Sequence, residues 1–522
     1  MKNLALKKIK RIGYYEPPFV GRRNFDGLLL DFNERTIKTD PAILRTIKKY
    51  LDSGDLQTYP EYRGLNERIA KYAGVSVENI MTVNGTDQGI DLIFRTFTDK
   101  DEVIIPQPSF AMFFQWSNIT GNKIISPVYD EKTMAFPFKN VLNSINKRTK
   151  LIVICNPNNP TGTLLSVKQI STIAKRAKNA IVYVDEAYFE FSKISAVGLL
   201  RQYSNIIISR TFSKAFGLGG LRIGYLIARP EYIREMSKVR GPYDVNMVAY
   251  LGAMAALENL SVTKLYVNEI INQSRPLVEK FFRENNIKYF SSASNFVLIR
   301  PDNSKKVFGI LKQNGVLVRL LNQQSSAGMI RVTVGTVSQM KIFINVYTDK
   351  ILTQKYAFID RDGTIIFEPQ DTFQIDSPAQ LKILPGVVTG LQKLMCAGYK
   401  LIMLSNQDGL GTKSYPKRNF DIVQNKLINI LKQSGIVFEK VFVCPHFERD
   451  ECLCRKPKLG LVKSFLEKQK IDLKNSFVVG DRKSDRDFSR NINACFVPMK
   501  TNGNFIKSVN DKLYEKKKSK IQ

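Results

Sequence analysis

Histidine is almost absent from this sequence, because His446 is the single copy among 522 residues. Imidazole is the side chain that most often carries acid–base chemistry near neutral pH, since its pKa lies in that range. One copy can serve one site at most. Any other chemistry in the chain must therefore run on other groups.

Long apolar runs are also missing. No stretch of about 18 apolar residues is present, so we expect no membrane-spanning helix. The basic N-terminus lacks the apolar core of a signal peptide. The hydrophobic fraction of 43% and the charged fraction of 24% are ordinary and argue against a disordered chain or a coiled-coil rod. A cytoplasmic globular protein is expected, with three or four folding units at roughly 150 residues each.

Acidic residues are outnumbered by basic ones, with 47 Asp and Glu against 79 Lys and Arg and a net charge of +32. Such an excess suggests a nucleic-acid partner. However, residues 353–522 hold 30 basic and 18 acidic residues, and the preceding part holds 49 and 29. Nucleic-acid-binding proteins usually concentrate their charge on one face or arm. Apart from a short basic tail, 516–520, the charge is spread evenly, so we expect small-molecule partners and no nucleic acid.

Two blocks of alternating strands and helices follow one another along the chain. In the first block, apolar runs at 151–155, 181–184 and 206–209 each lead into a polar loop, with a helical pattern such as 167–178 between them. The second block repeats this arrangement from Tyr356 onward. The pattern predicts parallel sheets covered by helices, with ligand sites at the carboxyl ends of the strands. We place the domains at 1–352 and 353–522.

Short polar segments follow the strands of the first block. In chain order they are Gly85-Thr86-Asp87, Asn159-Pro160-Thr161-Gly162, Asp185-Glu186-Ala187-Tyr188 and Thr211-Phe212-Ser213-Lys214, with Arg222 further on. Each alone is typical of a turn, a helix start or a surface lysine. Together they supply what pyridoxal phosphate (PLP) chemistry needs: a lysine for the aldehyde, an acid for the pyridine nitrogen, and donors for the ring oxygen and phosphate.

Residues from about 10 to 350 resemble histidinol-phosphate aminotransferases of PLP fold type I. The resemblance rests on YPEY, NGTDQGIDLIFRTF, CNPNNPTG, VDEAYFEF, SRTFSKAFGLGGLRIGY and IRVTVGT. It implies a large three-layer α/β/α domain with a small α/β domain, a homodimer, and glutamate as amino donor. Related enzymes of this fold aminate dihydroxyacetone phosphate or decarboxylate phosphorylated hydroxy-amino acids, so the PLP motifs alone leave the substrate open.

The resemblance also implies roles for individual residues. Lys214 would form the covalent link to PLP and transfer protons, Asp185 would contact the pyridine nitrogen, Asn159 and Tyr188 the ring oxygen, and Phe110 would stack on the ring. The PLP phosphate would be held by Thr86, Asp87, Ser213 and Arg222, and by Tyr59 of a neighbouring subunit. Arg331 would bind the carboxylate of glutamate, and Arg319 would bind the substrate phosphate. Phe19 and Phe110 stand where tyrosines are common. Phe110 still provides an aromatic ring for stacking. Phe19 lacks the tyrosine hydroxyl that would contact the substrate phosphate.

The second block carries acidic residues after its strands. Asp360 and Asp362 form a DxD pair at a strand end, and Ser405, Lys456 and Asp481 with Asp485 follow later. One carboxylate of such a pair can attack phosphorus while the other donates and accepts protons as a general acid and base. A hydroxyl and a lysine can bind phosphoryl oxygens, and a further carboxylate completes an oxygen-ligand site for Mg2+.

This ordered set resembles the haloacid dehalogenase (HAD) phosphohydrolases, which have a Rossmann-like α/β/α fold. The resemblance makes Asp360 the nucleophile that forms an aspartyl-phosphate. It makes Asp362 the acid that protonates the leaving alcohol and then activates water. Mg2+ would be held by Asp481, the Asp360 carboxylate and the backbone carbonyl of Asp362.

Cysteine is concentrated beside the single histidine. Cys444, His446, Cys452 and Cys454 fall within eleven residues, a spacing typical of metal ligands rather than of a disulfide framework. Three thiols and one imidazole suit a closed tetrahedral Zn2+ site with no position left for a catalytic water. We therefore predict a structural zinc that fixes the loop carrying Lys456.

Residues from about 355 to 500 resemble the histidinol-phosphate phosphatase domain, on FIDRDGTIIFEP, GYKLIMLSNQDGLGTKSYP, CPHFERDECLCRKPK and VVGDRKSD. Heptose-bisphosphate phosphatases share the zinc loop. Both halves then point to consecutive steps of histidine biosynthesis, so a bifunctional enzyme is the main hypothesis. One alternative is an aminotransferase and phosphatase that makes a serinol-like amino alcohol for surface polysaccharide, which Phe19 favours. The other is a basic, zinc-containing binding protein without catalysis.

Overall fold

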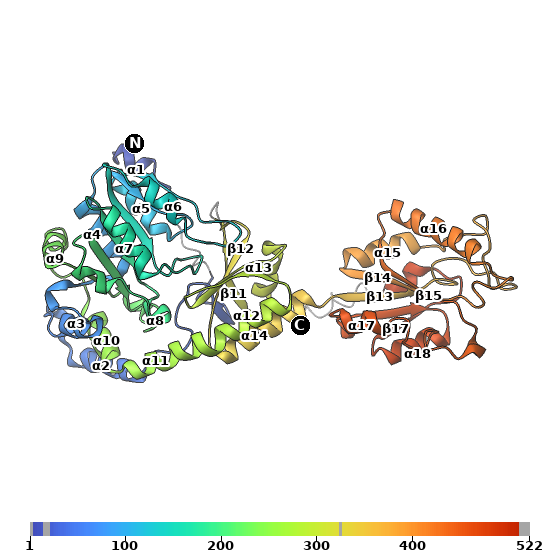
Figure 1. Cartoon of the computed structure of the whole chain (residues 1–522). Helices are drawn as coiled ribbons and strands as arrows, with labels where there is room; N and C mark the ends of the chain where they lie inside the picture. The colour runs from blue at the N-terminus through green and yellow to red at the C-terminus, as the bar shows by residue number, and fades with distance from the viewer. Residues whose placement is uncertain (1–3, 14–20, 323–325, 511–522) are drawn as a thin grey trace. The chain divides into compact units, whose positions relative to one another are not determined.

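The computed structural model describes residues 4–13, 21–322 and 326–510. Phe19 and the basic tail at 516–520 lie outside the described residues. The chain divides into two compact units, Met1–Tyr347 and Thr348–Gln522 (Figure 1). This division falls a few residues before the boundary expected between 352 and 353. Each unit is described by itself.

The first unit contains a seven-stranded sheet in the order β2-β8-β7-β6-β5-β3-β4. Strand β8 runs antiparallel to both of its neighbours, and the other neighbouring strands are parallel. Because consecutive parallel strands end at one edge, the loops that follow β5, β6 and β7 meet there. The strands are β2 Ile80–Val83, β3 Glu102–Ile104, β4 Lys123–Ile125, β5 Thr149–Cys155, β6 Ile181–Asp185, β7 Ile206–Thr211 and β8 Gly224–Ala228.

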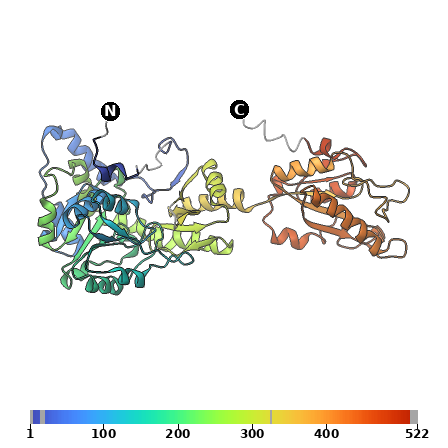
Figure 2. The same cartoon turned by 90° about the horizontal axis from the view of Figure 1, so that it is seen from above.

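Helices cover both faces of this sheet (Figures 1 and 2). Alternate strand residues point to opposite faces, so Ile152 and Val182 belong to one apolar core while Leu151 and Tyr183 belong to the other. The first core includes side chains of α3, α7 and α10, and the second includes α4, α5 and α9. The α-helices of this region are α1 Lys7–Lys10, α2 Pro41–Ser53, α3 Leu65–Ala73, α4 Gly85–Phe97, α5 Ala111–Ile119, α6 Phe138–Ser144, α7 Val167–Arg176, α8 Phe189–Ser192, α9 Pro230–Ser237 and α10 Met247–Glu258.

A smaller five-stranded sheet has the order β1-β11-β12-β10-β9. The pairing of β1 with β11 is parallel and joins the beginning of the chain to a strand close to the end of the unit. The remaining pairs are antiparallel. These elements are β1 Leu28–Leu30, β9 Lys288–Phe290, β10 Phe296–Arg300, β11 Val316–Leu321 and β12 Met329–Thr333, with α11 Leu260–Glu269, α12 Arg275–Glu284, α13 Ser304–Gln313 and α14 Val337–Tyr347.

The second unit is built on a five-stranded sheet that is parallel throughout, in the order β15-β14-β13-β16-β17. Ala357 and Ile359 contribute to an apolar core with α15 and α16, whereas Tyr356 and Phe358 face α17 and α18 (Figure 1). The elements are β13 Lys355–Asp360, α15 Val387–Cys396, β14 Tyr399–Asn406, α16 Lys417–Gln433, β15 Phe438–Cys444, α17 Lys463–Lys468, β16 Phe477–Gly480, α18 Lys483–Asn491 and β17 Cys495–Pro498.

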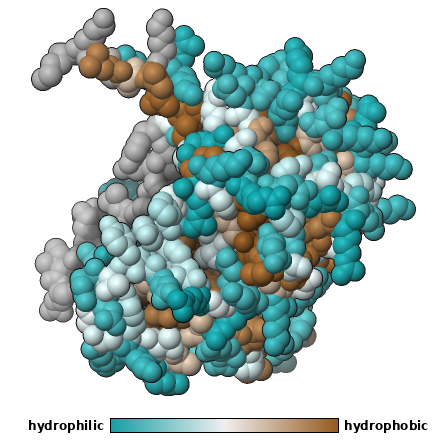
Figure 3. Space-filling view, turned by 90° about the vertical axis from the view of Figure 1, so that its left-hand side faces the viewer, coloured by the Kyte–Doolittle hydropathy of each residue, from teal (hydrophilic) through white to brown (hydrophobic). Residues whose placement is uncertain are grey.

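Apolar patches interrupt a mainly hydrophilic surface on the face of the molecule seen in Figure 3. Among the exposed apolar side chains of the first unit are Leu44 and Leu51 on α2, followed by Leu56 and Tyr59. The ring of Tyr59 lies 4.7 Å from that of Tyr243, which is also exposed. Within the described ranges, no helix combines the length and the apolar character that crossing a membrane requires.

Candidate active sites

The register of the large sheet brings the first set of predicted residues together. Cys155 at the end of β5 pairs with Asp185 of β6, and Asp185 pairs with Ser209 of β7. The loops after these strands carry Asn159, Tyr188 and Lys214 to the same edge. The sequence motifs therefore converge at the carboxyl ends of parallel strands, as a ligand site in this kind of sheet requires.

Lys214 is partly buried in this site. Its Nζ donates a hydrogen bond of 2.8 Å to the carbonyl oxygen of Phe32 and lies 6.0 Å from the ring centre of Tyr188. Burial, assisted by the positive charge of Arg331, lowers the pKa of Lys214 to about 8. A substantial fraction of the amine is therefore neutral near physiological pH, and a neutral amine is the form that attacks an aldehyde.

Asp185 is buried, and its carboxylate is held by hydrogen bonds. The carboxylate accepts a hydrogen bond of 2.8 Å from Ser209 Oγ, which in turn lies 2.8 Å from the hydroxyl of Tyr183. Burial raises the pKa of Asp185 to about 6. Among the described residues, no ion pair reaches this carboxylate. A protonated pyridine nitrogen would supply the missing positive charge, so this position fits PLP.

A cluster of polar side chains marks the start of α4. Arg222 forms an ion pair of 3.0 Å with Asp87, and its Nη1 lies 3.5 Å from Ser213 Oγ. A Cβ added to Gly224 would lie only 3.1 Å from the backbone nitrogen of Thr86, so this glycine leaves the amide space. Helix-start amides, hydroxyls and an arginine are suited to holding a phosphate. The four residues predicted for the PLP phosphate therefore gather in one place.

Arg331 connects the small sheet to the loops of the large sheet. Its Nη1 donates to Asn159 Oδ1 at 2.5 Å, and its Nη2 donates to the Asp31 carbonyl at 2.6 Å. Asn33, which is buried, donates a 2.9 Å hydrogen bond to the hydroxyl of Tyr188. Sequence reasoning missed this contribution of residues 31–33. The available signal was a polar Asp-Phe-Asn segment directly after the apolar run Leu28–Leu30.

The remaining predicted residues of the first site lie around this centre. Phe110 precedes α5 and packs its ring 5.7 Å from that of Phe113. Arg319 pairs with Arg331 across β11 and β12, and its guanidinium lies 5.6 Å from the ring of Phe32. Tyr59 is 76% exposed. An exposed position is what a residue serving a neighbouring subunit requires.

The second set of predicted residues forms a buried network around Lys456. Its Nζ lies 2.5 Å from Asp360 Oδ1 and 2.6 Å from Asp485 Oδ1, and it donates to the Leu404 carbonyl at 3.2 Å. Burial lowers the pKa of Lys456, but the two carboxylates raise it above its ordinary value overall. Burial also raises the pKa of Asp360 well above its usual range, although Lys456 opposes this effect. The lysine thus compensates two buried carboxylates at once.

Three carboxylates could hold a cation in this unit. Asp360, Asp481 and Asp485 each offer an oxygen, and these atoms lie within 4.8 Å of one another. Asp481 Oδ1 is buried without a hydrogen-bond partner among the described residues, so it is available as a ligand. Carboxylate oxygens are what Mg2+ prefers. Asp485 belongs to this set, although no separate role was predicted for it.

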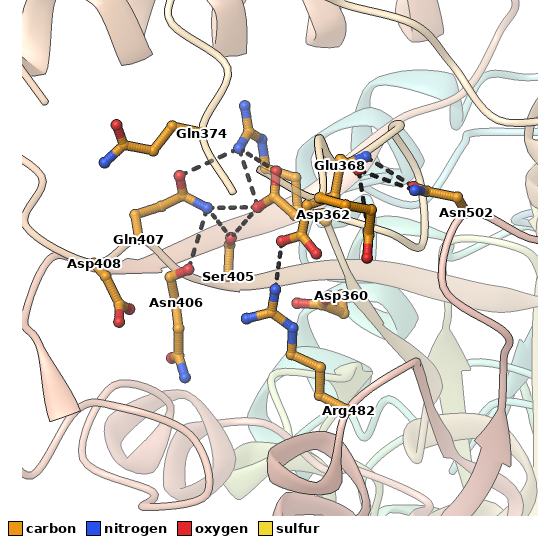
Figure 4. Close-up of polar contacts among 12 residues, drawn as sticks. Asp360, Asp362, Glu368, Gln374, Ser405, Asn406, Gln407, Asp408, Arg482 and Asn502 are labelled. Atoms are coloured by element: carbon orange, nitrogen blue, oxygen red, sulfur yellow. Dashed lines mark hydrogen bonds and ion pairs between the residues drawn. The ribbon is translucent and has the colours of Figure 1, made fainter. Parts of the chain in front are cut away.

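Asp362 is held by donors from both sides (Figure 4). Arg361 Nη1 lies 2.8 Å from Asp362 Oδ1. Gln407 Nε2 and Ser405 Oγ donate to Asp362 Oδ2 at 2.6 and 3.2 Å, and Tyr415 donates to Gln407 Oε1 at 3.0 Å. Gln407 was not predicted, and its hydrogen bond orients the Asp362 carboxylate.

The four predicted zinc ligands come together at the end of β15. The Sγ atom of Cys444 lies 3.6 Å from that of Cys452 and 3.2 Å from that of Cys454, and His446 Nδ1 lies 3.2 Å from Cys454 Sγ. A disulfide would need about 2.05 Å between sulfur atoms, so these thiols are unbonded. Their spacing fits ligands around one tetrahedral Zn2+, and Lys456 follows directly in the same loop.

The chain belongs to the aminotransferase class I and II family, whose model matches residues 26–346. The aminotransferase class expected from the sequence is thereby confirmed. Within this class, its first unit is homologous to histidinol-phosphate aminotransferases. It is 34% identical over 351 residues to the enzyme of Caldanaerobacter subterraneus, a match that covers 66% of this chain and 98% of that relative.

Another relative carries a different activity in its name. The dihydroxyacetone phosphate transaminase of Campylobacter jejuni is 35% identical over 322 residues, covering 60% of this chain and 87% of that protein. For the second unit, residues 355–513 match the family model described as polynucleotide kinase 3 phosphatase. A phosphatase relationship agrees with the fusion expected from the sequence.

Solved structures share the fold of the first unit. The histidinol-phosphate aminotransferase of Sinorhizobium meliloti, in complex with pyridoxal-5'-phosphate, matches with a TM-score of 0.61 at 21% identity, covering 66% of this chain and 96% of that chain. An L-threonine-O-3-phosphate decarboxylase from Porphyromonas gingivalis matches with a TM-score of 0.53 at 20% identity, covering 61% and 98%. The PLP fold type I expected for the first unit is confirmed.

Proposed function

We propose that the chain is a bifunctional enzyme of histidine biosynthesis. The first unit would transfer the amino group of glutamate to imidazole-acetol phosphate, giving histidinol phosphate and 2-oxoglutarate. The second unit would hydrolyse histidinol phosphate to histidinol. The observation that carries this proposal is that one chain contains two units. The first is an aminotransferase whose product would be a phosphate ester, and the second has a carboxylate site suited to hydrolysing such an ester.

In the first unit, PLP would supply the electron sink for transamination when bound. Lys214 would hold the cofactor and move the proton at the reacting carbon. Asp185 would keep the pyridine nitrogen protonated, with Asn159 and Tyr188 at the ring oxygen and Phe110 against the ring. Arg331 would take the carboxylate of glutamate and Arg319 the phosphate of the other substrate.

In the second unit we infer a HAD-type hydrolysis, which the parallel sheet and the carboxylate set support. Asp360 would attack phosphorus while Asp362 protonates the leaving alcohol, and Asp362 would then activate the water that releases phosphate. Ser405 and Lys456 would bind the phosphoryl oxygens. Mg2+ would take Asp360, Asp481 and the Asp362 carbonyl as ligands and neutralise the phosphate charge. Zn2+ at the cysteine loop would be structural.

A homodimer is also part of the proposal. Tyr59 and the apolar side chains near it are exposed on the first unit, and contiguous exposed apolar surface often marks a protein interface. In such a dimer Tyr59 would reach the PLP phosphate of the neighbouring subunit. The active site of the first unit would then be completed by a second copy of the chain.

Steady-state kinetics of the full-length protein test the proposal. With imidazole-acetol phosphate and glutamate, the protein should form 2-oxoglutarate and then release inorganic phosphate. Phosphate release from histidinol phosphate should be much faster than from p-nitrophenyl phosphate. Equal turnover of the two esters would refute the assignment of the second unit.

A second candidate function is the amination of dihydroxyacetone phosphate followed by release of serinol. The observation that favours it is the 35% identity to the Campylobacter jejuni transaminase. Both candidates involve a small phosphorylated ketone and an amino-alcohol phosphate. A comparison of kcat/KM for the two ketones decides between them, because a site shaped for imidazole should discriminate strongly against the smaller substrate.

A further inference from the structure

A second ion pair lies in the phosphatase site, separate from the network around Lys456. Arg482 binds the carboxylate of Glu368 (Figure 4). The Glu368 side chain is 4% exposed and that of Arg482 is 44% exposed. One charge is therefore buried, while the other is partly exposed and accessible to a ligand. Arg482 directly follows Asp481 and immediately precedes α18.

The backbone of Glu368 is held firmly in place. The Asn502 side chain accepts a 2.8 Å hydrogen bond from the Glu368 backbone nitrogen and donates one of 2.9 Å to its carbonyl oxygen. The preceding residue, Phe367, donates its backbone N–H to the Lys382 carbonyl at 2.8 Å. An ion pair that merely covered the surface would not need such support, whereas a recognition residue does.

The charges around this pair are unbalanced. Burial raises the pKa of Glu368, and although Arg482 lowers it, the negative charges of Asp362 and Asp481 raise it further. The Arg482 guanidinium is attracted by Asp360 and Asp481 as well as by Glu368. Glu368 therefore has one cationic partner but several acidic neighbours, and Arg482 lies within the electrostatic reach of the residue that would attack phosphorus.

We propose that Glu368 and Arg482 recognise the two opposite charges of an amino-alcohol phosphate. Arg482 binds the phosphate, and Glu368 binds the ammonium on the carbon next to the phosphate-bearing carbon. This inference rests on the phosphatase function proposed above and narrows its substrate class. Binding exchanges one ion pair for two, so no buried charge is left unpaired.

The same arrangement discriminates against phosphate esters without an amine. Such an ester would draw Arg482 toward its phosphate and leave the buried Glu368 carboxylate without a partner, which is costly. The sugar-phosphate end of a polynucleotide is one such ester. The pair thus favours the product of an aminotransferase over a nucleic-acid end.

The test compares two esters that differ only in the amine, using the full-length protein. Phosphate release is measured with histidinol phosphate and with its deaminated counterpart, the phosphate of imidazole-propanol. Serinol phosphate and propanediol phosphate serve as a second pair. In Glu368→Gln the ratio of kcat/KM for the amine ester to that for the amine-free ester should fall roughly ten- to a hundredfold, mainly through KM. The matched control Asp371→Asn, an exposed carboxylate in the same loop, should keep the wild-type ratio.

The outcomes separate the two proposals. An unchanged ratio in Glu368→Gln, or an equal loss on both esters, would overturn the role of Glu368 in charge recognition. Glu368→Asp keeps the negative charge and should keep most of the preference for the amine ester. A loss of this preference as large as in Glu368→Gln would also count against charge recognition by Glu368. A wild-type protein that hydrolyses both amine esters no faster than p-nitrophenyl phosphate would instead refute the proposed phosphatase function.

Discussion

The two sites differ in how they balance buried charge. In the first unit, Asp185 is buried and Lys214 is partly buried, and neither forms an ion pair with a described residue. Removal from solvent shifts the pKa of both toward the neutral form. In the second unit, Lys456 already binds Asp360 and Asp485. The first site is thus incomplete until a cofactor brings its charges. The second is balanced internally, so the metal and substrate proposed for it would have to enter an existing ion network.

Removing the central residue of each site should separate the two activities completely. Asp360→Asn is expected to lose phosphate release by at least about a thousandfold, since a carboxamide cannot attack phosphorus, while transamination persists. Lys214→Ala should show the opposite pattern. Both rates are measured on the same preparations, as 2-oxoglutarate formation and phosphate release. Loss of both activities in either variant would contradict two independent sites.

The next largest effect is expected from Lys456, where the charge balance can be broken directly. Lys456→Met leaves two buried carboxylates without their cation, which should destabilise the second unit by about 3–5 kcal/mol. Urea unfolding of the second unit measures this loss. Adding Asp485→Asn should recover part of it, because one uncompensated charge is removed. The exposed Lys458→Met serves as control and should change stability by less than about 0.5 kcal/mol.

The opposite result is expected for Asp185, because its charge has no partner in the cofactor-free protein. A pKa of about 6, raised from 3.8, means that the folded state binds more protons than the unfolded state between these values. Stability is therefore lost as pH rises through this window. Asp185→Asn should stabilise the cofactor-free protein above about pH 6 by about 2–3 kcal/mol and should have little effect below about pH 4.

This gain should come with a loss of transamination and of PLP retention, which absorbance measures after gel filtration. The exposed Asp99→Asn is the matched control and should leave stability unchanged at either pH. A destabilised Asp185→Asn protein near pH 8 would indicate that its hydrogen bonds outweigh the cost of burying the charge.

The smallest effect is expected at the zinc loop. One zinc per chain should be found by metal analysis. Cys452→Ser should abolish it and lower the unfolding midpoint of the second unit by roughly 3–6 °C, equivalent to about 1–2 kcal/mol. Phosphate release should fall because Lys456 lies in the same loop, while transamination is unaffected. Cys495→Ser, which changes an exposed cysteine outside the cluster, should retain zinc and activity.

The strand-end motifs are the part of the fold and site that the sequence predicts best. Apolar runs followed by polar loops correctly place Asp185 at the end of β6 and Asp360 at the end of β13, because parallel strands in such sheets share one functional edge. The cluster of Cys444, His446, Cys452 and Cys454 is likewise visible as local spacing.

Contacts between distant segments could not be predicted in this way. Asn33 reaches Tyr188 across 155 residues of sequence, and Glu368 is held by Asn502 across 134. Asparagine and glutamate in polar loops usually face solvent, so nothing local marks them as buried. Asp485 lies in the first turn of α18, four residues after Asp481, and its place beside Lys456 depends on the packing of α18 against β16.

The single histidine gives the protein a natural reporter. His446 is exposed and is the only imidazole in the chain, so its side-chain NMR resonances need no assignment by mutagenesis. Any reagent selective for imidazole would modify one position per chain. Metal loss, partial unfolding of the cysteine loop and binding events that disturb Lys456 can therefore be followed by one signal in the unmodified full-length protein.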